Sequence, residues 1–275
     1  MTLKVKPVPP AWVAAIDDFC SALRAGGSPH TTIATRRAHI RRVGRELGGT
    51  PFEVESERLV AWCGQQDWAV ETRRGVRASL LAFYRWAVAS DRTRENPANA
   101  LPKVRAAIPS PRPAGEITYR EALVRADSRA RLILRLAAEA GLRRAEVAQV
   151  HSRDLIEDLS GWSLIVHGKG GRQRVVPLPD GLASAIRERG RGWAFPGDFE
   201  GHLSPRWVGK IATELLPGDT TMHQLRHRFA TRAYSVDHDM FTVQELLGHS
   251  SPETTRRYVL VPRSALRDTV RAIAG

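Results

Sequence analysis

The segment RAAIPSPRPAGEIT, residues 105–118, carries three prolines at alternating positions. Proline lacks a backbone N–H and clashes with the preceding helical turn, so a helix does not run through such a segment. The apolar residues on its two sides must therefore be buried separately, and 275 residues are enough for two ordinary domains. We predict a first domain over residues 1–105, a proline-rich linker over 106–115 and a second domain over 116–275.

The first domain has the apolar spacing of a small helical bundle. Apolar residues recur three and four positions apart in stretches that predict helices over 12–23, 31–47, 56–63 and 72–88. Arg45 and seven further arginines lie off the apolar stripes of the second and fourth helices, and the seven are Arg36, Arg37, Arg41, Arg42, Arg73, Arg74 and Arg77. Such a row is either an ordinary solvated face or a surface that binds phosphates.

The second domain begins with helices and then changes its period. Residues 128–140 predict an apolar-rich helix that ends at a glycine, and a short helix follows near Arg143. Apolar residues then alternate over 162–166, a turn-forming stretch follows, and an extended pattern resumes over 175–178. This pattern predicts a β-hairpin with Lys169 at its tip, followed by helices to the end. The predicted fold class is mainly α with a small antiparallel β-sheet, in two domains.

The charge of the chain favours a polyanionic partner. Lysine and arginine exceed aspartate and glutamate by 13, and 37 of the 42 cations are arginine, whose planar fork matches phosphate geometry. Residues 1–105 carry 17 cations and 10 anions, and residues 106–275 carry 25 and 19. Two basic halves suit a clamp around a polyanion better than a globular body with a basic tail.

Cysteine usage and hydropathy narrow the setting. Cys20 and Cys63 lie far apart in apolar helical pattern, which indicates neither a disulfide framework nor a cysteine metal site. The N-terminus runs into prolines instead of the apolar segment of a signal, and no apolar run is long enough to span a bilayer. We therefore expect a cytoplasmic protein without membrane contact.

The stretch HQLRHRFATR, residues 223–232, permits two interpretations. His223 and His227 have the spacing of a zinc-binding helix, whereas His223 and Arg226 would point an imidazole and a guanidinium at one phosphate. A zinc hydrolase needs a carboxylate beside the first histidine, where this chain has Gln224, and neither cysteine nor clustered acid offers a third ligand. We therefore predict no metal, and a structural role for His227. The His-x-x-Arg pair alone is uninformative because it also occurs at His39.

Four segments, taken in order, favour the phosphate interpretation of His223 and Arg226. They read AGLRRAEVAQV at 140–150, HGKGGRQRVVPL at 167–178, HQLRHRFAT at 223–231 and LLGHSSPETTRRY at 246–258. In wording and order the set resembles the tyrosine recombinases, or lambda-type integrases. SLLAFYRWAVASDRTRENPANALPK, residues 79–103, is similar to the end of that family's core-binding domain. The resemblance covers nearly the whole chain.

The resemblance implies an active site whose composition agrees with elementary chemistry. Attack on a phosphodiester builds negative charge on the phosphoryl oxygens, and fixed cations aimed at that charge lower the barrier without a metal. Arg143 and Arg226 match the family's two arginines, which would bracket one scissile phosphate. Tyr258 matches its nucleophile, because a phenol, with a pKa of about 10, is easier to deprotonate and to displace again than an aliphatic alcohol. The phosphotyrosine retains the bond energy, so neither ATP nor any metal or cofactor is expected.

The other site residues take assisting roles by the same resemblance. Lys169 would protonate the leaving 5′-oxygen, and His223 would accept the tyrosyl proton or orient a phosphoryl oxygen. His249 would donate a hydrogen bond to a non-bridging oxygen, and Glu146 would support the site by hydrogen bonding. A solvated turn lysine and a helix-surface carboxylate are the plain alternatives for Lys169 and Glu146. The remaining tyrosines are alternative nucleophiles whose ordinary role is a packed aromatic: Tyr84, Tyr119 and Tyr234.

The resemblance also implies an assembly on DNA. Members of the family close a C-shaped clamp around one half-site, pair into a tetramer on two duplexes, and exchange strands through a Holliday junction. We therefore expect binding to att-like core sites through the seven first-domain arginines, a monomer when free and a homotetramer on synapsed DNA. An accessory directionality factor is a candidate partner.

Two ends of the chain bear on this assembly. Leu266, Val270 and Ile273 form an apolar stripe on a short terminal helix, which we expect to dock in trans, with docking in cis as the alternative. The core-binding pattern begins by about Trp12, so we expect no counterpart of the arm-binding domain that many phage integrases carry.

The predicted function is a site-specific DNA recombinase that integrates or excises a phage or mobile element in a bacterial cell. An Xer-like resolvase and a type IB topoisomerase share its chemistry, and a catalytically silent DNA-binding regulator would use the two basic domains alone. The intact set of arginine, lysine, histidine and tyrosine argues against the silent regulator.

Overall fold

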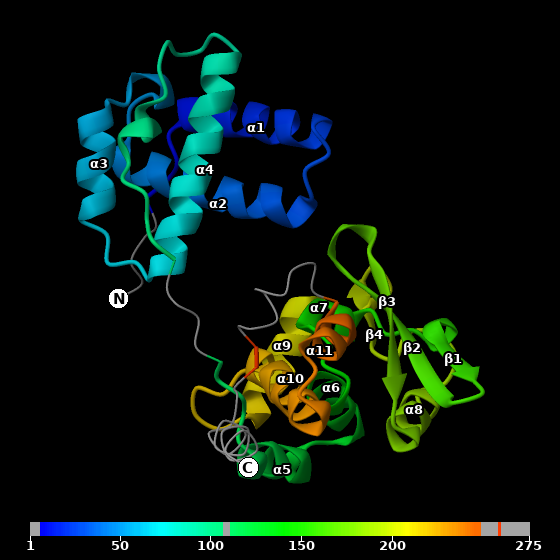
Figure 1. Ribbon diagram of the computed structural model, residues 1–275. Helices are drawn as coiled ribbons and strands as arrows, with labels where there is room; N and C mark the ends of the chain where they lie inside the picture. Colours follow the sequence, from blue (N-terminus) through cyan, green and yellow to red (C-terminus); the bar gives the residue numbers. More distant parts are fainter. Residues whose placement is uncertain (1–5, 107–110, 249–257, 260–275) are drawn as a thin grey trace, which may run out of the picture. The chain divides into compact units, whose positions relative to one another are not determined.

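The computed structural model describes residues 6–106, 111–248, 258 and 259 (Figure 1). The chain divides into two compact units, residues 1–108 and 109–275. The fold is mainly helical with one small antiparallel sheet, which confirms the predicted fold class. No helix among the described residues is both long and apolar enough to cross a membrane.

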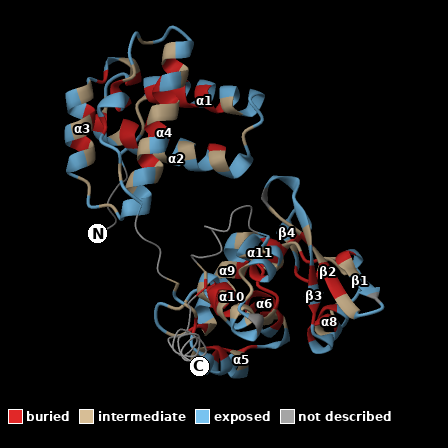
Figure 2. Cartoon of the chain, viewed as in Figure 1, coloured by how far each residue is buried: buried red, intermediate tan, exposed pale blue. Residues whose placement is uncertain are grey.

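Over residues 6–106, the described part of the first unit, four helices form a bundle. They are α1 (Pro10–Ala25), α2 (His30–Leu47), α3 (Ser56–Gly64) and α4 (Val70–Ala89), with short 3-10 helices η1 (Pro51–Glu53) and η2 (Pro97–Ala100). Their buried faces meet inside the bundle (Figure 2). Phe83 lies at the centre, with its ring 6.0 Å from that of Trp12 and 5.4 Å from that of Phe19. A Cβ at Gly44 would lie 2.8 Å from the Trp12 ring, so this glycine lets α2 approach α1 closely.

The second unit surrounds a central helix, α6, and carries the sheet on one side (Figure 1). Its helices are α5 (Glu116–Arg125), α6 (Ser128–Glu139), α7 (Arg144–Ala148), α8 (Asp180–Arg187), α9 (Pro205–Leu215), α10 (Met222–Asp237) and α11 (Met240–Leu247), with 3-10 turns η3 (Ser152–Asp154) and η4 (Lys169–Gly171). The sheet has the order β1 (Leu155–Asp158), β2 (Gly161–His167), β3 (Gln173–Leu178), and β4 (Pro196–Phe199) forms isolated bridges to His202.

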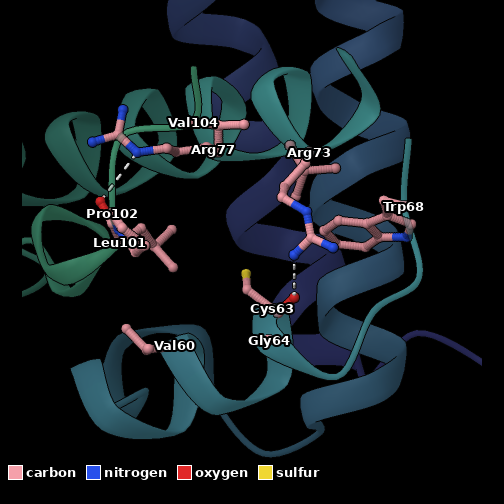
Figure 3. A pocket seen from close by; sticks show the side chains of 10 residues that line it. Val60, Cys63, Gly64, Trp68, Arg73, Arg77, Leu101, Pro102 and Val104 are labelled. Atoms are coloured by element: carbon pink, nitrogen blue, oxygen red, sulfur yellow. Dashed lines mark hydrogen bonds between the residues drawn. The ribbon is translucent and has the colours of Figure 1, made fainter. Parts of the chain in front are cut away.

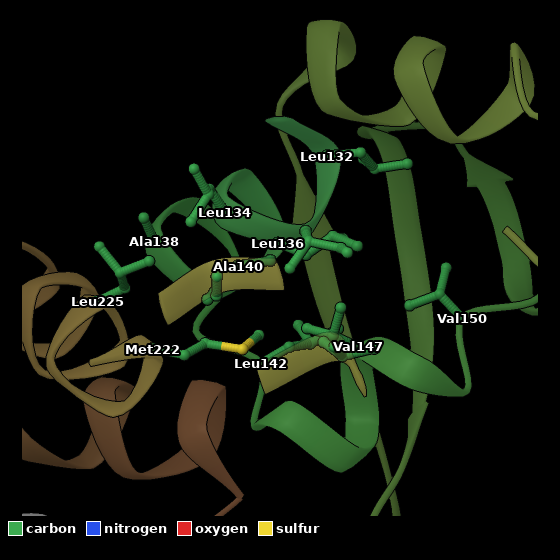
Figure 4. Close-up of a cluster of buried hydrophobic side chains, with 14 of the residues drawn as sticks. Leu132, Leu134, Leu136, Ala138, Ala140, Leu142, Val147, Val150, Met222 and Leu225 are labelled. Atoms are coloured by element: carbon green, nitrogen blue, oxygen red, sulfur yellow. The ribbon is translucent and has the colours of Figure 1, made fainter. Parts of the chain in front are cut away.

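The core of the second unit fixes where α7 and α10 lie. Leu132 and Leu136 of α6 are buried together with Leu142 and Val147, and Leu225 of α10 packs into the same cluster (Figure 4). Helix α6 packs on α10, and in the turn that follows α6 the Gly141 carbonyl accepts a hydrogen bond from Arg226 of α10. This packing brings two sequence motifs that are about eighty residues apart into one place.

Most elements agree with the sequence predictions, but α5, β1 and β4 were missed, and β4 interrupts the stretch after the hairpin that was predicted to be helical to the end. The helix at 128–140, the short helix at Arg143 and the hairpin all form, the last with Leu164 paired to Val176. Strand β1 makes the sheet three-stranded.

Candidate active site

Helix α10 begins at the stretch that permitted two interpretations. Thr221 caps the helix, and its backbone N–H donates to Gln224 Oε1 at 3.2 Å. Gln224, which occupies the position where a zinc hydrolase has a carboxylate, is therefore a capping residue. Among the residues that the structure describes, no group of three or more histidine, cysteine or acidic side chains could hold a metal ion.

Arg226 is the fully buried cation of α10. It is 0% exposed, and it donates to the carbonyl oxygens of Gly141 and, at 2.7 Å, of Leu247. Burial, together with the nearby Arg143, lowers the pKa of Arg226 to about 9, which still leaves it charged at neutral pH. A buried guanidinium is costly unless it is paired, and Glu146 Oε2 lies 3.6 Å from its Nη1.

Arg143 and Glu146 form the start of α7 as a mutually bonded pair. The Arg143 backbone N–H donates to Glu146 Oε2 at 2.7 Å, and its Nη1 donates to Oε1 at 2.6 Å. The Glu146 side chain is only 3% exposed, so the alternative of a helix-surface carboxylate is wrong, whereas the Arg143 side chain is 38% exposed. The structure therefore combines a buried carboxylate and a buried arginine with an arginine that reaches solvent.

Arg174 of β3 completes this cluster and was missed from the sequence. Its Nη1 and Nη2 donate to the two oxygens of Glu146 at 3.0 and 2.9 Å, and its Nε donates to Leu246 O at 2.9 Å. Burial opposes ionisation of Glu146, but the hydrogen bonds and charge of Arg174, with the N–H of Arg143, outweigh it and lower the pKa to about 2. The missed signal is strand alternation, which places Arg174 on the same face as buried Val176 and Leu178.

Tyr258 lies against one face of α10 in the same chain. Its ring is stacked on His227 at 4.4 Å between centroids and meets the edge of His223 at 5.1 Å. The Arg226 guanidinium carbon lies 5.5 Å from the centre of the Tyr258 ring, and Thr231 Oγ1 donates to the Tyr258 carbonyl at 3.4 Å. His223, Arg226 and His227, which lie about one helical turn apart, thus form a seat for the Tyr258 ring.

Both histidines of this seat favour the neutral form. Burial, followed by the charges of Arg226 and Arg143, lowers the pKa of His223. Burial, followed by His223 and Arg226, lowers the pKa of His227 to about 4. A neutral imidazole can accept a proton at neutral pH. The structural role expected for His227 includes direct packing on Tyr258.

Two of the alternative tyrosines are enclosed in the cores. The Tyr84 hydroxyl donates to Pro51 O at 3.1 Å, and the Tyr119 hydroxyl donates to Glu139 Oε1 at 2.7 Å. Burial raises the pKa of both phenols, which disfavours the nucleophilic phenolate. Tyr234 is half-buried beside His238.

Some predicted site residues are described in part or lie outside the described residues. The backbone of Lys169 begins the turn η4 between β2 and β3, where Gly170 and Gly171 have positive φ of 76° and 74°. His249 lies outside the described residues, as do the three apolar residues of the expected terminal helix: Leu266, Val270 and Ile273.

The first-unit arginines divide by their contacts. Arg73 donates to Cys63 O at 3.2 Å and Gln66 O at 2.7 Å, and Arg77 donates to Leu101 O at 3.1 Å. Both also line an apolar cavity of about 130 Å³ between α3, α4 and the segment after η2 (Figure 3). Arg73 and Arg77 therefore hold the bundle together.

Of the other five arginines, Arg37, Arg42 and Arg74 are exposed. Arg37 pairs with Asp17, Arg74 pairs with Glu71 at 2.9 Å, and Arg42 lies 5.0 Å from the Trp68 ring centre. Arg36 and Arg41 are half-buried on α2.

The chain is similar in sequence and fold to known proteins. Residues 118–263 match the phage integrase family. Tyrosine recombinase XerC of Bacillus pumilus is 33% identical over 227 residues, which cover 72% of this chain and 74% of the relative. A lambda integrase dimer bound to a COC′ core site has a TM-score of 0.74 at 18% identity, covering 90% of this chain and 76% of that one. A lambda integrase tetramer bound to a Holliday junction has a TM-score of 0.72 at 19% identity, covering 87% and 77%.

These matches place the fold and the motifs in one class, the site-specific recombinases that use tyrosine. The chain belongs to the phage integrase family of tyrosine recombinases, and membership assigns it tyrosine-type site-specific recombinase activity.

Proposed function

We propose that the chain cuts and rejoins DNA through Tyr258, with Arg143 and Arg226 holding the scissile phosphate. The observation that carries the proposal is the seat of Tyr258 on His223, Arg226 and His227 of its own α10. Arg226 is also bonded to Gly141, two residues before Arg143, so the nucleophile and both cations belong to one neighbourhood.

The proposed reaction is a balanced exchange of esters. The Tyr258 hydroxyl oxygen attacks phosphorus, the bond to the 5′-oxygen breaks, and a 3′-phosphotyrosine forms. His223, held neutral by burial and its cationic neighbours, accepts the phenolic proton. Lys169 supplies a proton to the leaving 5′-oxygen, and His249 donates to a non-bridging oxygen. In the second step a DNA 5′-hydroxyl attacks the phosphotyrosine and releases Tyr258.

The two arginines differ in burial, and this difference defines what each contributes. Arg226 is fixed by two backbone carbonyls, so its charge is oriented before DNA arrives, which is how preorganised cations lower a barrier. Arg143 is partly exposed and meets the phosphate from solvent. Neither step consumes a high-energy bond, so we propose that the reaction needs no ATP, metal or other cofactor.

We assign residues 1–105 to binding of the core-type site, 106–115 to the linker, and 116–275 to catalysis. The partners we propose are att-like duplex sites, bound by a monomer that assembles into a homotetramer on synapsed DNA, with a directionality factor as a further partner. The lambda integrase tetramer on a Holliday junction supports this assembly by fold alone. The proposed setting is bacterial DNA, and the proposed biological role is integration or excision of a phage or mobile element.

A second candidate role is resolution of replicon dimers. It is favoured by the 33% identity to a tyrosine recombinase XerC over most of both chains. The two roles separate by their substrates, because an integrase joins two unlike att-type sites and a resolvase recombines two copies of one site. Assaying both pairs on plasmids decides between them.

The reaction is tested with a suicide duplex. A site is first selected by binding from randomised duplexes, then nicked close to the cleavage position and incubated with the protein in EDTA. We expect a covalent 3′-phosphotyrosyl adduct that is absent in Tyr258→Phe and retained in the matched control Tyr234→Phe. Reversible binding without an adduct would instead identify a regulator.

A further inference from the structure

Arg174 connects three segments of the second unit through one buried side chain. It belongs to β3, the strand that follows the turn bearing Lys169. Its guanidinium forms a two-pronged pair with Glu146 at the start of α7 and donates to Leu246 near the end of α11. The side chain is 8% exposed, and a Cβ on Gly248 would lie 2.7 Å from its Cδ.

The geometry is specific for arginine. All three guanidinium nitrogens donate in one plane, two to a carboxylate and one to a backbone carbonyl. A lysine ammonium is a compact point charge that cannot reproduce this fork. A buried cation with such a complete set of acceptors is a fixed part of its surroundings.

The position of Arg174 decides how the other two arginines share Glu146. Each Glu146 oxygen accepts one bond from Arg174, so only part of the carboxylate is left for Arg143 and Arg226. If Arg174 were absent, the emptied acceptor positions would draw those two guanidinium groups onto Glu146. The carboxylate would then neutralise their positive charge, and less of it would act on a phosphate.

We propose that Arg174 is a positioning residue for DNA cleavage: by occupying Glu146 and holding the end of α11, it keeps Arg143 and Arg226 aimed at the scissile phosphate. The proposal rests on the function proposed above. Arg174 itself touches neither the phosphate nor the nucleophile in this role. It acts through Glu146 and through Leu246, which lies next to the Leu247 carbonyl that Arg226 bonds.

The test compares two scissile groups in the suicide duplex, an ordinary phosphate and a methylphosphonate. The methylphosphonate lacks one anionic oxygen, so less negative charge develops in its transition state. Its cleavage rate therefore depends less on how Arg143 and Arg226 are oriented. We compare Arg174→Met and Arg174→Lys with the matched control Arg172→Met, which removes an exposed charge from the same hairpin. Adduct formation is measured as a first-order rate at saturating protein, beside the DNA dissociation constant and the thermal midpoint.

On the phosphate we expect Arg174→Met to slow adduct formation about 100-fold, the scale on which loss of one preorganised donor acts. On the methylphosphonate the ratio of the wild-type rate to the Arg174→Met rate should be at least tenfold smaller than on the phosphate, a difference of about 1.4 kcal/mol in activation free energy. Arg174→Lys should show the same pattern more weakly, and Arg172→Met should match the wild type on both.

Equal deficits on the two substrates, in variants that fold and bind DNA, would overturn the proposal and leave Arg174 a purely structural residue. Wild-type rates in Arg174→Met would overturn it as well. If Arg174→Met does not fold, Arg174→Lys provides the same comparison. An adduct that persists in Tyr258→Phe would instead reject the proposed function, so the two failures are distinguishable.

Discussion

His227 shows how much one side chain can carry beyond its sequence motif. The sequence predicts a structural role for His227, and in the structure its ring is stacked on that of Tyr258. Its Nδ1 is buried and accepts no hydrogen bond from any described residue. Burial disfavours the protonated ring, and the charges of His223 and Arg226 add to this effect, so the pKa of His227 falls to about 4.

This depressed pKa predicts a pH dependence of stability. An unfolded histidine, with a pKa of about 6.5, binds a proton between pH 6.5 and 4, whereas folded His227 does not. The free energy of unfolding is therefore highest above pH 6.5 and falls as the pH drops through that window, by at most about 1.4 kcal/mol per pH unit from this group. His227→Phe, which keeps an aromatic ring, should flatten the fall.

Urea unfolding at half-unit steps of pH measures this dependence. The control is His30→Phe, at an exposed position, whose profile should follow the wild type. Glu146 contributes in a lower window, between its ordinary pKa of 4.5 and about 2, so it does not interfere above pH 4.5. A profile unchanged in His227→Phe would mean that His227 titrates normally in the folded protein.

Chemistry and resemblance together predict Arg143 and Arg226 as the cations that bracket one phosphate and Tyr258 as the nucleophile. The structure brings these three residues to one neighbourhood. Arg174 was not predictable in that way, because a strand arginine usually faces solvent and only tertiary packing shows that its partner is a buried glutamate.

The turn between α6 and α7 is the element on which the placement of Arg143 depends. Gly141 has a φ of +65°, and its carbonyl accepts a hydrogen bond from Arg226. A Cβ at this position would lie 2.4 Å from Phe229 Cδ1, so a substituent would push α10 away from the turn. Both the backbone conformation and the close approach require glycine.

We predict that Gly141→Ala destabilises the protein by about 2–5 kcal/mol, since the left-handed backbone costs an L-residue about 1–2 kcal/mol and overpacking adds about 1–3. Gly218→Ala is the matched control, because it has a similar φ of +59° and no atom within 4 Å of the added Cβ. Gly218→Ala should lower the free energy of unfolding only by the cost of the left-handed backbone, about 1–2 kcal/mol. Equal losses in urea unfolding would show that the contact with Phe229 relaxes without cost.

The arginines of α2 and α4 should separate into two kinds when mutated. Arg73→Ala removes the donors to the Cys63 and Gln66 carbonyls at and just after the end of α3, so it should lower the free energy of unfolding by about 1–3 kcal/mol. Arg36→Ala and Arg41→Ala should change it by less than about 0.5 kcal/mol. If the latter two bind phosphates, each should reduce the slope of log affinity against log salt by about 0.9. An unchanged slope would identify an ordinary solvated face.

The elements were predictable where apolar periodicity was strong. Helices α2, α4 and α6 each present buried residues three and four positions apart, and their ends fall within a few residues of the prediction. Helix α5 buries only Tyr119 and Ala122, and it is held by Glu116, which accepts a hydrogen bond from Arg228 of α10. Strand β1 has four residues and depends on pairing with β2. Helix α5 is therefore fixed by a partner 112 residues away and β1 by pairing with the strand that follows it, and neither contact is revealed by local pattern.

The two units of the whole molecule have separate cores, each with its own buried cluster. They also share the positive charge, with an excess of seven cations in residues 1–105 and six in 106–275. Two basic modules joined by a short linker bind one polyanion more tightly than either alone, because the second module binds at a high effective concentration after the first. Linkage is therefore expected to supply much of the affinity.

We predict that residues 111–275, expressed alone, still form the Tyr258 adduct on the suicide duplex but need a protein concentration at least about 100-fold higher, within the range over which linkage raises avidity. Adding residues 1–108 as a separate chain should not restore the affinity, whereas the intact chain has it. Filter binding at several salt concentrations measures the affinity and its salt dependence. The intact chain should show the steeper slope of log affinity against log salt, because it neutralises more phosphates. Equal affinity of the second unit and the intact chain would mean that the first unit makes no contact with the site, and recognition would then lie wholly in the unit that carries the tyrosine.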